Sequence, residues 1–247
     1  MIFMTWVKIC GITNLEDAQT AVDVGADALG FVFYEKSPRN IDPGAAREIV
    51  DKLPEEMEKV GVFVVGSDLE WDHIFRRVGL TAVQHQFSFA TKAPQGSPKG
   101  VCISSFPRKP RFFVSLPVSP FLGDEQALKS LAADFAHLWP EVQGQPPVPD
   151  GVFDTFFLDS GSQQHPGGTG QPFDWEKAVP IAEAMRQGGL KLVVAGGLTP
   201  SNVGEAIRIL KPWGVDVSSG VEERPGKKDA EKVRSFIAAV RQIEKSA

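Results

Sequence analysis

The sequence predicts a single-domain (β/α)8 barrel, because short apolar runs alternate with helical patterns from one end of the chain to the other. About eight such repeats of roughly 20 to 40 residues fit a parallel barrel covered by helices. The length of 247 residues is also typical of one barrel of this kind. Two of the last apolar runs end in small residues, Gly196-Gly197 and Ser218-Ser219-Gly220. Residues 1–247 are therefore interpreted as one domain.

The first half of the chain follows this alternation regularly. Thr13 and Glu16 have the spacing of a capping box for the first helix, which Gly25 ends. Asp42-Pro43 opens the second helix, and residues 68–78 are expected to form the third. The predicted strands are 6–10, 28–33, 59–65 and 81–84.

The second half is less regular. Residues 87–110 are rich in proline and glycine and lack a helical period, so we expect the fourth helix to be missing or replaced by a loop. A helix from Asp124 is followed by a Pro-rich surface connection at 140–149. The later helices are expected to begin at Asp174, at Thr199-Pro200 and at about Asp229. The predicted strands are 111–116, 152–159, 192–195 and 215–217.

Composition excludes several functional classes. The net charge of −5 offers no general attraction to nucleic acid or to an anionic membrane. Two cysteines without a framework of spacings favour a reduced, cytoplasmic protein. The N-terminus does not resemble a signal peptide, and no apolar run is long enough to cross a bilayer. The four histidines show no metal-ligand spacing, so we expect no metal site.

Three reactive side chains fall at predicted carboxyl ends of strands, where active sites on this fold lie: Cys10, Arg39 and Asp159. Each has an ordinary explanation when taken alone. Cys10 is a nucleophile, a base or a small buried residue, Asp159 a cap, and Arg39 a solvated charge. Strand alternation turns Lys8 and Cys10 together into the barrel, where Lys8 is expected to lower the thiol pKa. As a group, they suit proton transfer on a substrate that bears a carboxylate.

The glycine-rich turns near the C-terminus suggest where such a substrate is anchored. Loops after strands 7 and 8 of these barrels often bind phosphate through backbone N–H groups. The expected phosphate-binding residues are Gly196, Gly197, Ser219 and Gly220. Ordinary tight turns are the alternative explanation. A phosphorylated sugar that carries a carboxylate fits the whole set of residues.

At these residues the sequence resembles the phosphoribosylanthranilate isomerase family of tryptophan biosynthesis. The resemblance implies an Amadori rearrangement of N-(5-phosphoribosyl)anthranilate to 1-(2-carboxyphenylamino)-1-deoxyribulose 5-phosphate. It rests on the order and spacing of five blocks: KICGIT at 8–13, GFVFYEKSPRNI at 30–41, LDSGSQQHPGGTGQPFDW at 158–175, AGGLTPSN at 195–202, and VDVSSGVEERPGKKD at 215–229.

The resemblance also implies roles for individual residues. Asp159 is then the general acid that opens the sugar ring, and Cys10 is the general base that takes the C2 proton. Arg39 binds the anthranilate carboxylate, and Asp216 is given a substrate contact. The resemblance implies no cofactor and no metal, and we expect a monomer rather than a homodimer. The implied lid loop consists of Gly167, Gly168, Thr169 and Gly170.

One block departs from the family pattern. Strand 4 of such enzymes usually ends Val-Gln-Leu-His-Gly, whereas this chain has Val83-Gln84-His85-Gln86-Phe87. The one-residue shift turns His85 to the opposite face of the strand, so His85 is left out of the predicted site. Two other functions stay open: an aminoimidazole-carboxamide ribotide isomerase, and a catalytically silent phosphosugar-binding barrel. Cys10 argues against the first, and the pair of Cys10 and Asp159 argues against the second.

Overall fold

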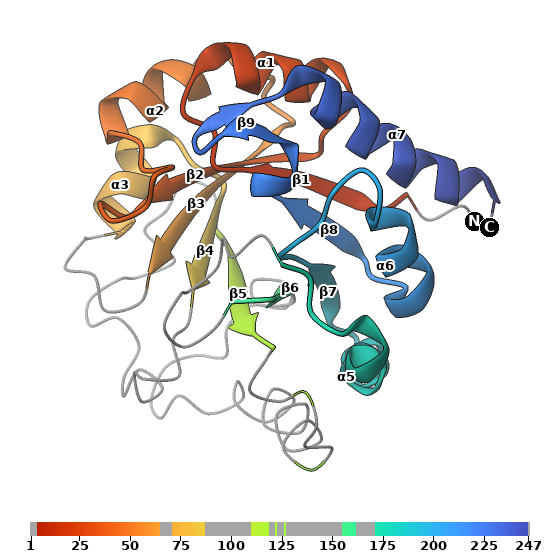
Figure 1. The fold of residues 1–247 in the computed structure, drawn as a ribbon. Coiled ribbons are helices and arrows are strands. Elements are labelled where there is room, and N and C mark those ends of the chain that lie inside the picture. Colours follow the sequence, from red (N-terminus) through yellow and green to blue (C-terminus); the bar gives the residue numbers. More distant parts are fainter. Residues whose placement is uncertain are drawn as a thin grey trace, which may run out of the picture.

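The computed structural model describes residues 4–64, 71–86, 110–118, 122, 126, 155–161 and 171–246. Its parallel strands close into a barrel in the order of the chain, which confirms the predicted fold class (Figure 1). Strand boundaries differ from the predicted ones by at most a few residues. The strands are β1 (Trp6–Cys10), β2 (Ala28–Phe33), β3 (Glu58–Val64), β4 (Ala82–Gln86), β5 (Arg111–Pro117), β6 (Thr155–Asp159), β7 (Lys191–Val194) and β8 (Gly214–Val217).

Helices lie outside the barrel and cover its strands (Figure 1). They bury apolar faces of the predicted kind, such as Ala178, Ile181, Ala182 and Met185 in α5. The helices of the described part are α1 (Leu15–Asp23), α2 (Pro43–Val50), α3 (Trp71–Val78), α5 (Trp175–Gln187), α6 (Val203–Leu210) and α7 (Ala230–Ser246). After β8 come a short 3-10 turn, η2 (Ser219–Val221), and a hairpin of β9 (Glu222–Arg224) and β10 (Lys227–Lys228). No helix in the described ranges is both long and apolar enough to span a bilayer.

Two predicted helix caps are wrong. The cap of α1 is Asn14, whose side chain accepts a hydrogen bond from the Asp17 N–H, and the Thr13 hydroxyl instead donates to the Gly226 carbonyl. Helix α6 begins after Asn202, which makes no side-chain capping bond. Residues 200–202 form a turn, and the Thr199 hydroxyl pairs with the Ser201 hydroxyl at 2.9 Å. In both places a contact outside the helix takes the group that local spacing assigns to the cap.

The interior of the barrel is apolar at one end and polar towards the other. Ala28, Val60, Ala82, Phe113 and Phe157 belong to a buried cluster on the inner faces of the strands. Lys8, Gln84, Ser115, Asp159 and Asp216 are also buried, and alternation along each strand turns them to the same inner side. The barrel thus places a buried polar region beneath the carboxyl ends of its strands.

Four expectations fall outside the described residues. They are the missing fourth helix at 87–110, of which only residue 110 is described, the helix from Asp124, of which only residue 126 is described, the Pro-rich connection at 140–149, and the lid at Gly167 to Gly170.

Candidate active site

An ion pair inside the barrel joins β1 to β8. The Lys8 ammonium donates to the Asp216 carboxylate at 2.9 Å, and both residues are buried. Lys8 and Asp216 are direct register partners in the parallel pair, so their side chains emerge side by side on the inner face. The predicted inward orientation of Lys8, Cys10 and Asp216 is therefore observed.

Gly30 on β2 makes room for this cluster. A Cβ atom at Gly30 would lie 2.8 Å from the Cys10 Sγ and 3.0 Å from the Lys8 Nζ. Any side chain at this position would displace the thiol or the ammonium. The conformation of Gly30 is one that other residues adopt, so the requirement for glycine is one of space. This residue lies in a recognised sequence block, but its packing role was not predicted.

The electrostatics of Cys10 differ from the sequence-based expectation. Burial raises the pKa of the Cys10 thiol, and the neighbouring Lys8 ammonium opposes that shift without cancelling it. The prediction of a lowered thiol pKa is therefore wrong in its net direction. Burial works to lower the pKa of Lys8, but Asp216 and Cys10 raise it above its ordinary value, so the ammonium stays charged. Cys10 is consequently a thiol in the free protein at neutral pH.

Arg39 has a buried partner that sequence reasoning missed. Its Nε and Nη2 atoms donate to the two carboxylate oxygens of Glu222, each at 2.8 Å. The Lys228 ammonium donates to the same carboxylate at 2.9 Å. Burial disfavours charge on Glu222, but its bonds to Arg39 and Lys228 outweigh this and lower the pKa of its carboxyl. A two-pronged bond of this kind fixes the plane of the guanidinium group.

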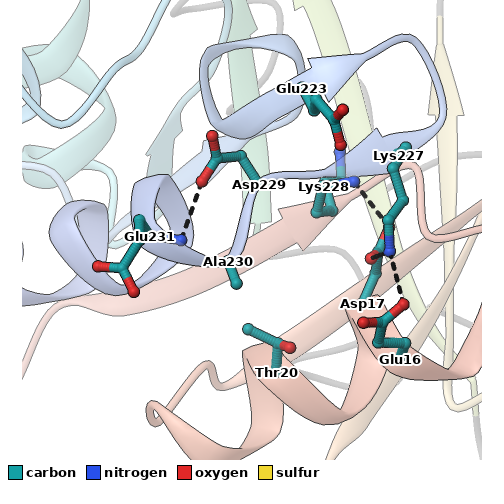
Figure 2. A pocket seen from close by; sticks show the side chains of 9 residues that line it. All are labelled: Glu16, Asp17, Thr20, Glu223, Lys227, Lys228, Asp229, Ala230 and Glu231. Carbon is teal, nitrogen blue, oxygen red and sulfur yellow. Dashed lines mark hydrogen bonds and ion pairs between the residues drawn. The ribbon is translucent and has the colours of Figure 1, made fainter.

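The hairpin that carries Glu222 and Lys228 is attached to α1. The Lys227 ammonium donates to Asp17 at 2.6 Å and to Glu16 at 2.9 Å, and Figure 2 shows it pointing at both carboxylates. The Lys228 N–H also donates to Asp17, at 2.7 Å. A cavity of about 280 Å³ lies between α1, the hairpin and the start of α7. These contacts between the hairpin and α1 thus help to hold Glu222 beside Arg39.

Asp159 is the last residue of β6 and is only 9% exposed. Its Oδ1 atom accepts a hydrogen bond of 2.8 Å from the Gly161 N–H. Phe157, two residues earlier on the same face, lies with its ring centre 5.4 Å from the Lys8 Nζ. A contact across the interior therefore links β1 with β6 just below the level of Cys10 and Asp159.

The loops after β7 and β8 are packed against each other. A Cβ atom at Gly220 would lie 1.8 Å from the Leu198 carbonyl oxygen, so only glycine fits. Gly196 and Gly197 adopt φ angles of +81° and +67°, which glycine accepts readily. Within the described part of the chain, no hydrogen bond uses the N–H groups of Gly196, Gly197, Ser219 or Gly220. The two loops that carry the predicted phosphate-binding residues thus lie against each other, and the N–H groups of these residues have no partner among the described residues.

His85 faces away from the barrel interior, as the shifted register predicts. Its ring centre lies 6.0 Å from that of Trp71 on α3, and it stacks with Phe112 at 6.5 Å. Burial among these rings lowers the pKa of His85 to about 4. The residue belongs to the outer apolar layer.

Function on this fold resides at the carboxyl ends of the strands, where Cys10 ends β1 and Asp159 ends β6, with the buried Lys8–Asp216 pair close by. The closed barrel and the buried groups of the site together indicate an enzyme with a (β/α)8 fold. A family model described as N-(5'phosphoribosyl)anthranilate (PRA) isomerase matches residues 7–86 and 144–239. The chain belongs to this family.

Individual relatives agree with this assignment. An N-(5'-phosphoribosyl)anthranilate isomerase of Geobacter sp. (strain M21) is 42% identical over 243 residues, which cover 97% of this chain and 100% of the relative. A crystal structure of phosphoribosyl anthranilate isomerase in complex with reduced 1-(o-carboxyphenylamino)-1-deoxyribulose 5-phosphate is 33% identical with a TM-score of 0.69. A structure of monomers generated from the dimeric isomerase of Thermotoga maritima is 32% identical with a TM-score of 0.67. Each match covers 97% of this chain and 100% of the solved chain.

Proposed function

We propose that this chain converts N-(5'-phosphoribosyl)anthranilate to 1-(2-carboxyphenylamino)-1-deoxyribulose 5-phosphate in tryptophan biosynthesis. The family match carries this proposal, because its two segments contain the proposed acid, the proposed base and the residues proposed to bind the carboxylate and the phosphate. The relative with reduced 1-(o-carboxyphenylamino)-1-deoxyribulose 5-phosphate shows that a barrel of this family binds a reduced form of that product.

The proposed reaction needs one acid and one base. Asp159 in its protonated form gives a proton to the ring oxygen, the C1–O bond breaks, and the nitrogen lone pair forms an iminium ion at C1. Cys10 in its thiolate form then removes the proton from C2, and the electron pair neutralises the iminium to give an enolamine. Tautomerisation places a proton on C1 and leaves a ketone at C2. The iminium of the substrate itself accepts the electrons, so the proposal includes neither metal nor cofactor.

The remaining residues bind the two charged ends of the substrate. Arg39 binds the anthranilate carboxylate with the part of its guanidinium group that Glu222 leaves open. Gly167, Gly168, Thr169 and Gly170 are proposed as a lid, and Asp216 as a contact held by Lys8. Backbone N–H groups of Gly196, Gly197, Ser219 and Gly220 bind the phosphate.

We further propose that the protein works as a monomer in the cytoplasm and that residues 1–247 form one domain. Among the described residues, Met4 is the one large hydrophobic side chain that is exposed, at 66%. The described part of the surface therefore offers little apolar area for a stable interface between copies. Light scattering at micromolar concentration tests the proposal, and the mass of a dimer would overturn it.

The reaction is tested by the loss of substrate fluorescence when purified protein is added to freshly prepared phosphoribosylanthranilate. We expect turnover by the wild-type protein and none by a double variant that lacks both Cys10 and Asp159. A folded wild-type protein that binds the substrate without converting it would refute the proposal and favour a silent barrel. Turnover of an aminoimidazole-carboxamide ribotide precursor in its place would favour the sister isomerase.

A further inference from the structure

Two buried polar groups inside the barrel have no hydrogen-bond partner. Among the described residues, three buried side-chain polar atoms lack one: the Gln84 Oε1, the Ser115 Oγ and the Trp175 Nε1. Gln84 and Ser115 are 3% and 0% exposed, and they lie on the adjacent strands β4 and β5. A buried polar atom without a partner is unfavourable, because it loses its hydrogen bonds to water and gains none in return. Both groups therefore lower the stability of the folded protein.

Both side chains face the substrate side of the proposed site. Gln84 follows Ala82 by two residues, and Ser115 follows Phe113 by two; Ala82 and Phe113 belong to the buried interior cluster. Side chains two residues apart on a strand share a face. On β4 and β5, Gln84 and Ser115 are thus the next inward-facing residues towards the carboxyl ends of the strands.

The register of the strands sets their height in the barrel. Cys10 pairs with Gly30, Gly30 with Val60, Val60 with Ala82, and Ala82 with Arg111. Strands in this barrel are tilted relative to its axis. Along a line of register partners, the height along the barrel axis therefore falls by about one residue per strand. Four strands from β1, the inward residue level with Cys10 is therefore Ser115 on β5.

The same reasoning places Gln84 one layer lower. That layer takes its inward side chains from the even-numbered strands, and Gln84 on β4 is opposite Asp216 on β8. One wall thus carries the thiol and the Lys8–Asp216 pair, and the facing wall carries two neutral polar groups without partners. A small molecule with several hydroxyl groups could form hydrogen bonds with both of these side chains.

We propose that Ser115 and Gln84 bind hydroxyl groups of the sugar portion of the substrate, on the wall opposite Cys10. This inference rests on the proposed function and adds a binding surface that neither the charged groups nor the glycine loops supply. The Ser115 hydroxyl both donates and accepts, whereas the Gln84 Oε1 accepts only. Neither group is ionisable in the working range, so they position the sugar carbon chain and take no part in the proton transfers.

The test compares Ser115→Ala and Gln84→Met with the wild-type protein in two measurements. The expected result is a fall in kcat/KM of roughly 3- to 10-fold for each variant, the size of one lost hydrogen bond. The melting temperature is expected to stay unchanged or to rise, because each substitution removes an unsatisfied buried group. A structural role would give the opposite pattern, with a lower melting temperature and unchanged kinetics.

Thr155→Val is the matched control. Thr155 also points into the barrel but lies towards the amino ends of the strands, and its hydroxyl accepts a hydrogen bond from Arg111 at 3.4 Å. This variant should lose thermal stability and keep its kcat/KM. Competitive inhibition by inorganic phosphate should be the same in all variants, since the glycine loops are unaltered.

The outcomes separate the two proposals. A wild-type protein without turnover refutes the proposed function. Normal turnover by the wild type together with normal kcat/KM in Ser115→Ala and Gln84→Met refutes only the sugar-binding role. A fall in kcat/KM accompanied by altered phosphate inhibition would also overturn it, because the substitution would then have disturbed the whole site.

Discussion

Arg39 and Glu222 are 183 positions apart in the chain, yet two hydrogen bonds of 2.8 Å join the guanidinium edge to the carboxylate. Lys228 holds the same carboxylate from another side. The substrate-binding arginine of the proposal is therefore fixed in its plane before any ligand arrives. Preorganisation of this kind lowers the entropy that binding must overcome.

Glu222→Gln is expected to raise KM about 10-fold while changing kcat less. Glutamine has nearly the same size but presents only one acceptor atom to Arg39 and removes the charge that balances Lys228. Steady-state kinetics with phosphoribosylanthranilate measure the effect. Glu223→Gln is the control, because Glu223 is the exposed neighbour on the same strand. Equal kinetics in the two variants would show that Glu222 does not position Arg39.

Arg39→Ala should chiefly weaken substrate binding. The variant loses the carboxylate contact and leaves Glu222 facing Lys228 alone, so we expect KM to rise by roughly 10- to 100-fold, as for a charge-assisted hydrogen bond. Inhibition by inorganic phosphate should be unaffected. An unchanged KM and kcat would contradict the assigned role.

Cys10→Ser and Asp159→Asn are each expected to lower kcat by at least about 100-fold, since each removes one of the two proton-transfer groups. Both substitutions conserve size, so circular dichroism and the melting temperature should stay close to those of the wild type. Single-turnover experiments separate chemistry from product release. A rate near that of the wild type in either variant would mean that its role is wrongly assigned.

The pH profile should report the raised thiol pKa. Burial raises the pKa of Cys10, so the reactive thiolate fraction of the free protein grows as the pH rises from neutral into the alkaline range. The ultraviolet absorbance of the thiolate, with Cys10→Ser as the blank, should therefore increase mainly above the pH at which an ordinary thiol ionises. The ratio kcat/KM follows the product of the thiolate fraction of Cys10 and the protonated fraction of Asp159, so the absorbance and not the rate measures the thiol pKa. A thiolate absorbance that is already complete at neutral pH would contradict the raised pKa.

His85 should make stability depend on pH. Its pKa is about 4 in the folded state and near 6.5 in the unfolded state, so between these values the unfolded chain binds more protons. The free energy of unfolding should therefore rise with pH across this window, by up to about 3 kcal/mol. Denaturant titrations measure it. His85→Leu should remove most of the slope, whereas His73→Gln, at an exposed position, should keep it.

Some of the site was accessible from local sequence patterns. Alternation along 6–10 places Lys8 and Cys10 on the inner face, and the shifted histidine of strand 4 predicts the outward ring of His85. These inferences hold because a strand has a fixed period of two residues, whichever residues lie next to it.

By itself the sequence determined the succession of strands and helices, the closure into a barrel and the family, since all three follow from local period and motif order. Only the tertiary structure decided the partner of Arg39, the choice of Asn14 over Thr13 as a cap, and the direction of the Cys10 pKa shift. The physical reason is the same in each case. A hydrogen bond or a loss of hydration depends on groups that folding brings together from distant parts of the chain, and no local pattern encodes that distance.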